Sequence, residues 1–461
     1  MEKWLAAALD YLPRWLGYQM LATEQPGCVV AVAHKGRVVL ERAFGHADLK
    51  RGTPLTPRHR FRVASHSKTF TAAGILKLRE SGRIGLDDPL GRHVAGLTPA
   101  VAGVTIGQLL SHTAGLVRDG SDSGQWTDRR PFLDETALRA DLSHGTVIEP
   151  NTRFKYSNHG YGLLGLVIEA LTGEPYAEWI AREIVAASGL EETAPDAPQA
   201  LASAHTPFAR GHTGKLPMGH RVVIPGDNPT HALASATGFV STGGDLVRFF
   251  SSLIPSAKKS VLSAASRREM SRRLWRDPHS SAERWYGLGT ISGTLADWEW
   301  FGHSGSFQGT VTRTANVPAH DLTVSVLTNA TDGSSQVWLD GTLHLLRAFA
   351  RHGGPSRKTA AWAGRWWSLW GAVDLLAMND KVLVANPMLG NPVQDASEIE
   401  VSGRRGGVAT GRIALAGGFA NHGEPVRLVF DGRGKAKELW LAGGKLLPQA
   451  KVEKELFARY E

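Results

Sequence analysis

Apolar residues in the first twenty positions of the chain recur at the 3.6-residue period of an amphipathic helix. Glu2, Asp10 and Arg14 interrupt this stretch, and no small-residue cleavage site follows it, so it is unlike a signal peptide. No segment approaches the roughly 20 consecutive apolar residues that a membrane span needs. We therefore expect a helix that packs on the rest of the protein, no membrane partner, and a cytoplasmic protein.

Strand-like patterns occur near both ends of the first 350 residues. Val29–Ala33 and Arg37–Arg42 are rich in β-forming residues and flank His34-Lys35-Gly36, which predicts a hairpin. Thr310–Asn316 and Leu322–Thr328 alternate in the manner of two further strands. A helical pattern follows them to about residue 351.

The region between these strands has mainly helical patterns, from Ser65 to about Phe250. Ala72–Leu78 and Leu163–Leu171 are apolar nearly all round, which is typical of buried helices. Strands from both ends of a region with helices between them predict an α+β domain. We expect one antiparallel sheet flanked by helices, with a helical subdomain beside it.

The pattern changes after residue 351. Residues 352–360 are rich in Gly, Ser, Lys and Arg and predict a linker. Beyond them, short strand-like runs are separated by glycines, which predicts a small β-barrel at residues 361–461. The expected strands of this domain are Lys381–Ala385, Glu398–Val401, Val426–Phe430 and Glu438–Ala442.

The composition of the 461-residue chain excludes several classes of protein. Lys and Arg outnumber Asp and Glu by 52 to 43, but no basic run or nucleic-acid-binding module is present, so we expect no nucleic-acid partner. The single cysteine, Cys28, excludes an internal disulfide and a cysteine-based zinc cluster. No H-E-x-x-H or comparable cluster occurs among the histidines, so we expect neither a metal nor another cofactor.

The first motif that suggests chemistry is Ser65-His66-Ser67-Lys68, an S-x-x-K that opens an apolar helix. Residues three apart share one helix face, so the Ser65 hydroxyl and the Lys68 amine can meet. Desolvation lowers the proton affinity of a lysine, and an uncharged amine can accept the serine proton. The same spacing recurs at residues 256–259, so taken alone it also fits a capping serine and a solvated lysine.

The second motif, Tyr156-Ser157-Asn158, precedes the helix expected at Leu163–Leu171. Positions i and i+2 of an extended segment point the same way, so the phenol and the carboxamide can face one cleft. Tyr156 would then relay protons, and Asn158 would bind the substrate or Lys68. The alternative is a core tyrosine and a turn asparagine.

The third motif is His303-Ser304-Gly305, after an aromatic run and before the strand at Thr310–Asn316. A glycine on an edge strand permits the close approach of a substrate backbone. We expect His303 to present a donor to the nucleophile, and the amide of Ser306 to share an oxyanion hole with the amide of Ser65. Because H-x-G also begins at three other histidines, the prediction depends on the three motifs occurring together.

Together these motifs resemble the serine hydrolases related to class C β-lactamases and penicillin-binding proteins, including D-aminopeptidases and related esterases. The resemblance covers about residues 20–350, and the last hundred residues are similar to a lipocalin-like β-barrel extension of some members. It rests on Phe61–Ala72, Leu109–Leu116, Phe154–Asn158 and Gly238–Thr242 leading to Asp245. It implies a β-lactamase/transpeptidase-like hydrolase domain at residues 1–351.

The resemblance also implies roles for individual residues. Ser65 would be the nucleophile, Lys68 its proton acceptor, Tyr156 the relay to the leaving group, and Asn158 an orienting group. Typical β-lactamases and transpeptidases of this group begin the third motif with lysine, whereas this chain has His303 there. The difference weakens the expectation that the site recognises a carboxylate of the substrate. Members of the group with H-x-G tend to be aminopeptidases, amidases or esterases.

Neighbouring motifs have structural interpretations. Adjacent residues seldom face each other productively, so we expect Ser111 and His112 to form a structural loop. Thr242 and Asp245 have the spacing of a helix start. Gly302–Gly305 does not form the nucleophile turn of an α/β-hydrolase, because position 306 is serine rather than glycine.

We therefore predict a serine hydrolase that forms an acyl-enzyme at Ser65. The expected substrates are small molecules or short peptides, cleaved at the amide bonds of small peptides or amino-acid amides, and the resemblance implies D-configured ones among them. The alternatives are a carboxylesterase or an acyltransferase using the same serine, or a ligand-binding protein without turnover. The sequence does not decide whether the chain forms a homo-oligomer. It also does not decide whether the C-terminal domain contributes a loop to the cleft.

Overall fold

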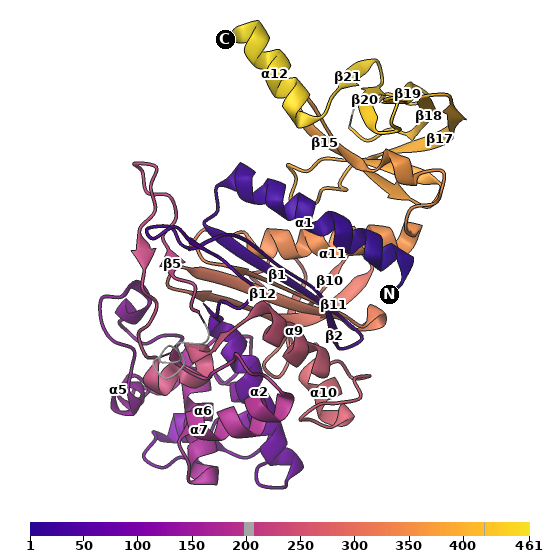
Figure 1. Ribbon diagram of the computed structural model, residues 1–461. Helices are drawn as coiled ribbons and strands as arrows, with labels where there is room; N and C mark the ends of the chain where they lie inside the picture. Colours follow the sequence, from indigo (N-terminus) through magenta and orange to yellow (C-terminus); the bar gives the residue numbers. More distant parts are fainter. Residues whose placement is uncertain (198–206, 419) are drawn as a thin grey trace. The chain divides into compact units, whose positions relative to one another are not determined.

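The structure, a computed structural model, describes residues 1–197, 207–418 and 420–461. Contacts between residues divide the chain into two units: residues 25–339, and residues 1–24 together with 340–461 (Figure 1). Each unit is described by itself. The functional domain limits of 1–351 and 361–461, with a linker between them, stay a prediction.

A nine-stranded antiparallel sheet forms the centre of the unit at residues 25–339. Within it β1 pairs with β13, and Cys28 lies opposite Thr328, so segments from the two ends of the unit meet as predicted (Figure 1). In spatial order the strands are β3 (Thr53–Pro54), β2 (Arg37–Asp48), β1 (Gly27–His34), β13 (Leu322–Thr328), β12 (Thr310–Val317), β11 (Trp298–Phe307), β10 (Ile291–Leu295), β9 (Arg284–Tyr286) and β8 (Trp275–Arg276).

The turn between β1 and β2 follows from local chemistry. Lys35 and Gly36 both have positive φ values, of 53° and 73°. Two central residues with positive φ match the right-handed twist of the flanking strands, which is why such turns form hairpins. The hairpin predicted from His34-Lys35-Gly36 is confirmed.

The helical subdomain contains the two buried helices that the sequence predicts. Helix α2 (Ser67–Glu80) is buried from Ser67 to Leu76, and α6 (Asn158–Thr172) is buried from Asn158 to Ile168. Figure 1 shows them beside α7 (Tyr176–Ile180), whereas α9 (Gly243–Ser252) packs on β1 and β13. Shorter helices complete the unit: α3 (Pro99–Ala102), α4 (Ile106–Leu110), α5 (Glu135–Asp141) and α10 (Ala264–Met270).

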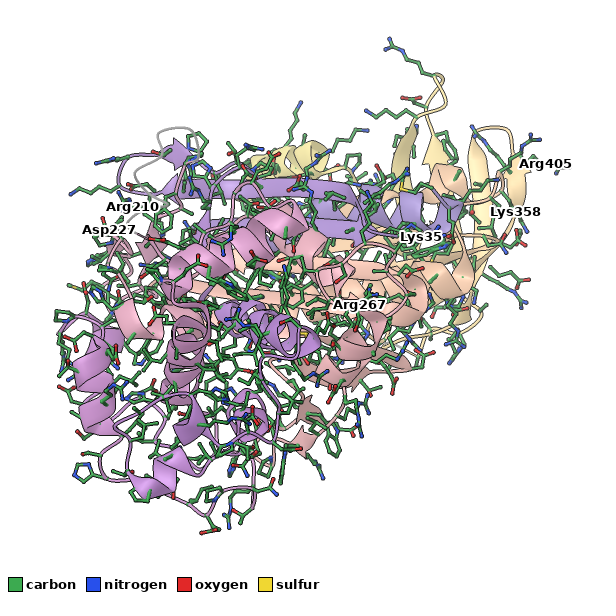
Figure 2. All side chains as sticks on the ribbon, turned by 90° about the horizontal axis from the view of Figure 1, so that it is seen from below. Lys35, Arg210, Asp227, Arg267, Lys358 and Arg405 are labelled. Carbon is green, nitrogen blue, oxygen red and sulfur yellow. The ribbon has the colours of Figure 1, made fainter. Side chains whose placement is uncertain are left out.

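Two short strand pairs and a buried arginine hold this subdomain together. β4 (Phe61–Arg62) pairs with β7 (Val240–Ser241), and β5 (Gly211–His212) pairs with β6 (Val223–Ile224). Arg267 of α10, labelled in Figure 2, donates to the carbonyl oxygens of residues 252, 254 and 257, so it caps the end of α9.

The unit at residues 1–24 and 340–461 contains a nearly closed antiparallel barrel, which confirms the predicted C-terminal barrel. Its strands follow one another in chain order, and Trp367 of the first strand bonds the backbone of Leu447, which directly follows the last. They are β14 (Gly364–Ser368), β15 (Gly371–Met378), β16 (Lys381–Ala385), β17 (Ser397–Arg405), β18 (Val408–Leu415), β19 (Pro425–Phe430), β20 (Ala436–Leu441) and β21 (Gly444–Leu446).

The barrel is filled by alternate side chains, as the two-residue period of a strand requires. Ile399 and Val401 of β17, for example, are buried against Val426 and Leu428 of β19. Sequence patterns had indicated four of the eight strands. They had not indicated β14, β15, β18 or β21.

The α-helices that lie wholly or partly in the described residues of this unit are α1 (Lys3–Thr23), α11 (Ser335–His352) and α12 (Gln449–Tyr460). Helix α1 is fixed by side-chain bonds, because Trp15 donates to the carbonyl oxygen of Leu389 and Gln19 to that of Pro387. Among the described residues, no helix has an apolar stretch long enough to cross a bilayer.

Candidate active site

A cavity of about 660 Å³ opens in the unit at residues 25–339, where the start of α2 meets α6 and β11. Lys68 does not line it but lies fully buried directly beside Ser65. The structure therefore brings the three predicted motifs to one place. The predicted site residues that line the cavity are Ser65, Tyr156, Asn158, His303, Gly305 and Ser306.

Ser65 lies in a short 3₁₀ turn, Ala64–His66, directly before α2 rather than within it. Ala64 has a φ of 47°, a left-handed value that costs free energy for any residue with a side chain. The turn is held in this shape by Ser67, whose hydroxyl donates to the carbonyl oxygen of Ala64 over 2.5 Å and accepts from the amide of Phe239 over 3.0 Å. A strained turn fixed by its neighbours presents the Ser65 hydroxyl at the edge of the cavity.

Gly305 supports this turn. A Cβ at position 305 would lie 2.1 Å from the carbonyl oxygen of Val63, so no larger residue fits without moving the turn or the strand. We predicted that this glycine admits a substrate backbone. In the structure, the backbone of residue 63, which leads into the nucleophile turn, approaches this glycine closely. Gly305 also lines the cavity, and its contact with a substrate backbone stays a prediction.

The Lys68 amine has three partners within hydrogen-bond distance. Nζ lies 3.1 Å from Ser65 Oγ, 2.7 Å from Asn158 Oδ1 and 2.8 Å from the carbonyl oxygen of Ala236. All three partners are uncharged, and burial holds the pKa of Lys68 well below its ordinary value. A lysine in this position is suited to accept a proton.

Tyr156 donates its hydroxyl to Ser65 Oγ over 2.9 Å. Its ring packs on the His112 ring at 4.1 Å, and the Lys68 amine lies 4.8 Å from the ring centroid. Burial raises the pKa of Tyr156 to about 12, so the phenol stays protonated at neutral pH. It can donate to Ser65 or to a leaving group.

Ser157 explains why Tyr156 and Asn158 face the same cavity. It is extended, with φ −141° and ψ 120°, and its hydroxyl caps α6 by accepting from the amide of Gly160. The residues on either side therefore point the same way, as predicted. Asn158 also donates to the carboxylate of Asp119 over 2.6 Å, a contact that the sequence did not indicate.

His303 lines the cavity, but its ring nitrogens have other partners. Nε2 lies 3.0 Å from the Tyr286 hydroxyl, and Nδ1 lies 2.7 Å from the carbonyl oxygen of Ser304. Burial holds the pKa of His303 well below its ordinary value, so the ring is uncharged at neutral pH. We expected a donor aimed at the nucleophile, whereas the structure directs the ring toward Tyr286 and its own strand.

The neighbouring motifs have the structural roles predicted for them. Ser111 donates its hydroxyl to the carbonyl oxygen of Gly107, and His112 accepts from the amide of Ser157. Thr242 caps α9 by accepting from the amide of Asp245. Within the described part of the chain, no group of His, Cys, Asp and Glu side chains is arranged to hold a metal ion.

Sequence reasoning missed several residues that line the cavity. Arg118 and Asp119 begin one residue beyond the predicted signature loop at Leu109–Leu116, so their position in the sequence was the one available signal. Phe154 begins the predicted segment Phe154–Asn158 but was given no role there. Others belong to no motif and are brought in by strands or loops distant in sequence: Trp126, Arg284, Trp285, Tyr286 and Gln308.

An α+β fold with a serine and a lysine at the start of one buried helix, and a tyrosine brought to them from the segment before another, defines a β-lactamase/transpeptidase-like protein. The model of the Beta-lactamase family matches residues 14–347, well over half of the chain, and the chain belongs to that family. The predicted resemblance to class C β-lactamases and penicillin-binding proteins is thereby confirmed, and with it the class of serine hydrolases.

Individual relatives agree with this assignment. Protein flp of Staphylococcus aureus (strain MW2) is 32% identical over 161 residues, which is 34% of this chain and 32% of that protein. The chain thus spans about a third of the length of this curated relative.

Two solved structures share the fold. An octameric penicillin-binding protein homologue from Pyrococcus abyssi has a TM-score of 0.67 at 22% identity, covering 95% of this chain and 99% of its own. The D-amino acid amidase from Ochrobactrum anthropi SV3, solved with L-phenylalanine amide, has a TM-score of 0.60 at 23% identity, covering 76% and 98%. At these identities the likeness supports the fold alone.

Proposed function

We propose that this chain hydrolyses amide bonds of small peptides or amino-acid amides through an acyl-enzyme at Ser65. The observation that carries the proposal is the environment of Ser65 Oγ, with the Lys68 amine at 3.1 Å and the Tyr156 hydroxyl at 2.9 Å. Because burial favours the uncharged amine, Lys68 can take the serine proton without a histidine.

In the first step, Ser65 Oγ attacks the carbonyl carbon of the substrate while its proton passes to Lys68 Nζ. The developing oxyanion is stabilised by backbone amides, for which those of Ser65 and Ser306 remain our candidates. The C–N bond then breaks as the leaving amine takes the proton of Tyr156, and the proton that Lys68 accepted restores the phenol. The product of this step is an ester on Ser65.

In the second step, a water molecule attacks this ester and loses a proton to the uncharged Lys68 amine. The C–O bond to Ser65 breaks, the acid leaves, and the proton returns to Ser65 Oγ. If an amine replaces the water, the same site acts as an acyltransferase, and an ester substrate would make it an esterase.

The cavity supports a small substrate with both apolar and polar parts. Aromatic side chains of Trp126, Phe154, Trp285 and Phe307 line it together with the charged groups of Arg118, Asp119 and Arg284. His303 stands where typical β-lactamases of this group have lysine, so no lysine amine is available there for a carboxylate. The amidase from Ochrobactrum anthropi, whose structure holds an amino-acid amide, shares this fold and makes D-amino acid amides the first substrates to test.

The test is a comparison of the wild-type chain with Ser65→Ala on D- and L-amino-acid p-nitroanilides, short acyl esters and a chromogenic cephalosporin. We expect turnover of an amide or ester to fall at least about ten-thousandfold in Ser65→Ala. A fluorophosphonate probe should label Ser65 of the wild-type chain, as mapped by mass spectrometry. The matched control is Ser111→Ala, which removes a hydroxyl that bonds a backbone carbonyl and should leave labelling unchanged.

Labelling at another serine, or turnover that survives Ser65→Ala, would remove the assignment. Turnover of esters with none of amides would favour the carboxylesterase. Formation of an amide when a free amine is added would favour the acyltransferase. Labelling at Ser65 without turnover of any substrate would favour a binding protein.

A further inference from the structure

Asp119 contacts the candidate site through a side chain that does not itself reach Ser65. Its Oδ1 accepts from Asn158 Nδ2 over 2.6 Å and from the Trp126 indole over 2.9 Å. Its Oδ2 pairs with Arg118 over 2.9 Å, and the side chain is 13% exposed. Both oxygens of this carboxylate are therefore held in place at the wall of the cavity.

This carboxylate decides which way round the Asn158 amide lies. An asparagine has a donor end and an acceptor end, whereas an ionised carboxylate can only accept. The NH₂ group of Asn158 must therefore face Asp119, and Oδ1 faces Lys68 Nζ at 2.7 Å. The reverse orientation would place two acceptor oxygens against each other and leave the NH₂ group facing the amine.

The orientation of Asn158 in turn decides where the lone pair of Lys68 points. An uncharged amine has two N–H groups and one lone pair. The oxygens of Asn158 and Ala236 are acceptors at 2.7 and 2.8 Å, so they take the two N–H groups. The lone pair is left for the third neighbour, the hydroxyl of Ser65 at 3.1 Å.

We infer that Asp119 is a positioning residue, which acts through Asn158 to aim the lone pair of Lys68 at Ser65. The inference rests on the proposed function, because it assigns the aimed amine the task of accepting the serine proton. It gives a reason for an ionised side chain that faces the cavity without contacting Ser65.

A second effect of Asp119 makes the inference testable. Burial lowers the pKa of Lys68, the negative charge of Asp119 raises it, and the positive charge of Arg118, which pairs with Asp119, lowers it. Removing that charge should lower the pKa of Lys68 further. The rate of acylation, which rises with pH as Lys68 loses its proton, should then reach its plateau at a lower pH. A merely structural role for Asp119 would not move this limb of the profile.

The experiment measures the rate of Ser65 labelling by a fluorophosphonate against pH for the wild-type chain, Asp119→Asn and Asp119→Leu. In both variants we expect the acidic limb to move to lower pH. The plateau should fall about tenfold to a hundredfold in Asp119→Leu, because nothing then fixes the amide of Asn158. It should fall less in Asp119→Asn, whose own Oδ1 can still accept from Asn158. If Asp119→Leu does not fold, the shift in Asp119→Asn decides.

The matched control is Asp128→Asn, which removes the same charge from an exposed residue of the same loop. Asp128 has a φ of 57°, which asparagine tolerates, so its pH profile should coincide with the wild-type profile. A double-mutant cycle completes the design. Once Asn158→Leu has removed the intermediary, Asp119→Leu should reduce the rate by less than twofold more.

The inference is overturned if folded Asp119 variants keep the wild-type acidic limb, or if the effects of Asp119→Leu and Asn158→Leu are independent. A titration of ¹³C-labelled lysine by NMR separates this outcome from a failure of the proposed function. If the pKa of Lys68 falls in Asp119→Asn while Ser65→Ala remains active, the link between the two residues stands and the proposed nucleophile is wrong.

Discussion

The two units of the chain each bury an ionisable side chain, and they surround it differently. Asp374, in the unit at residues 1–24 and 340–461, is 2% exposed and accepts two hydrogen bonds from Arg365 over 2.7 and 2.8 Å, with a third from Tyr11 over 2.6 Å. Lys68, in the unit at residues 25–339, is completely buried, and its hydrogen-bond partners are uncharged.

The difference lies in the partner rather than in the depth of burial. When two opposite charges are buried in contact, removing either one leaves the other buried without its partner, so the pair holds together the elements that carry it. A buried amine among neutral groups loses its proton readily, which makes it a base. Asp374 therefore ties α1 to β14 and β15, whereas Lys68 is available for reaction.

The largest expected effect comes from replacing Lys68, the buried group whose hydrogen-bond partners are uncharged. Lys68→Met keeps the apolar stem and removes the amine, so Ser65 loses its proton acceptor. We expect Ser65 labelling by a fluorophosphonate to slow about a thousandfold or more, with the fold retained by circular dichroism. The control is Lys77→Met on the same helix, which removes an ammonium group paired with Glu183 and should label normally. Labelling of Lys68→Met within tenfold of the wild-type rate would contradict the role of Lys68.

Replacing Asp374, the buried carboxylate in contact with Arg365, should instead lower the stability of the barrel. Asp374→Ala leaves the Arg365 guanidinium and the Tyr11 hydroxyl without their partner, so we expect the free energy of opening around β14 and β15 to fall by about 3 kcal/mol. Hydrogen exchange of the barrel amides measures this loss. The control is Asp10→Ala, whose carboxylate pairs with Arg14 in an exposed position and should change the exchange little. Unchanged protection in Asp374→Ala would show that the buried pair does not stabilise the barrel.

The smallest of these effects concerns the second partner of Ser65. Tyr156→Phe removes the hydroxyl that donates to Ser65 Oγ and keeps the ring that covers Lys68, so we expect acylation to slow about tenfold to a hundredfold. Tyr161→Phe is the matched control, because that buried tyrosine donates to the carbonyl oxygen of Leu110 instead. Equal rates in the two variants would mean that the Tyr156 hydroxyl takes no part in proton transfer.

The elements that the sequence predicted are those with a local signal. The β1–β2 hairpin follows from Lys35 and Gly36, and the buried helices α2 and α6 follow from their continuous apolar residues. The candidate site was found because three short motifs occur together. Each motif spans only three or four consecutive residues, so the local backbone conformation determines how its side chains are placed.

The features that the sequence did not predict depend on contacts between distant residues. Ala64 is left-handed in a turn that the Ser67 hydroxyl joins to the distant Phe239 amide, and an alanine gives no sign of that conformation. His303 turns toward Tyr286 because the strands between them bring that hydroxyl within 3.0 Å. The pairing of Tyr11 with Asp374 joins residues 363 positions apart, beyond the reach of any periodic pattern.

The pairing of Cys28 with Thr328 has a consequence for how the protein is made. A ribosome synthesises roughly 5–20 residues per second, so β1 waits about 15 s to 1 min for β13, which follows it after three hundred residues. Throughout that time one edge of an almost entirely apolar strand has no neighbour. The nascent chain is therefore exposed to misassociation longest at β1, and we expect the yield of active protein to depend on chaperones that cover that edge.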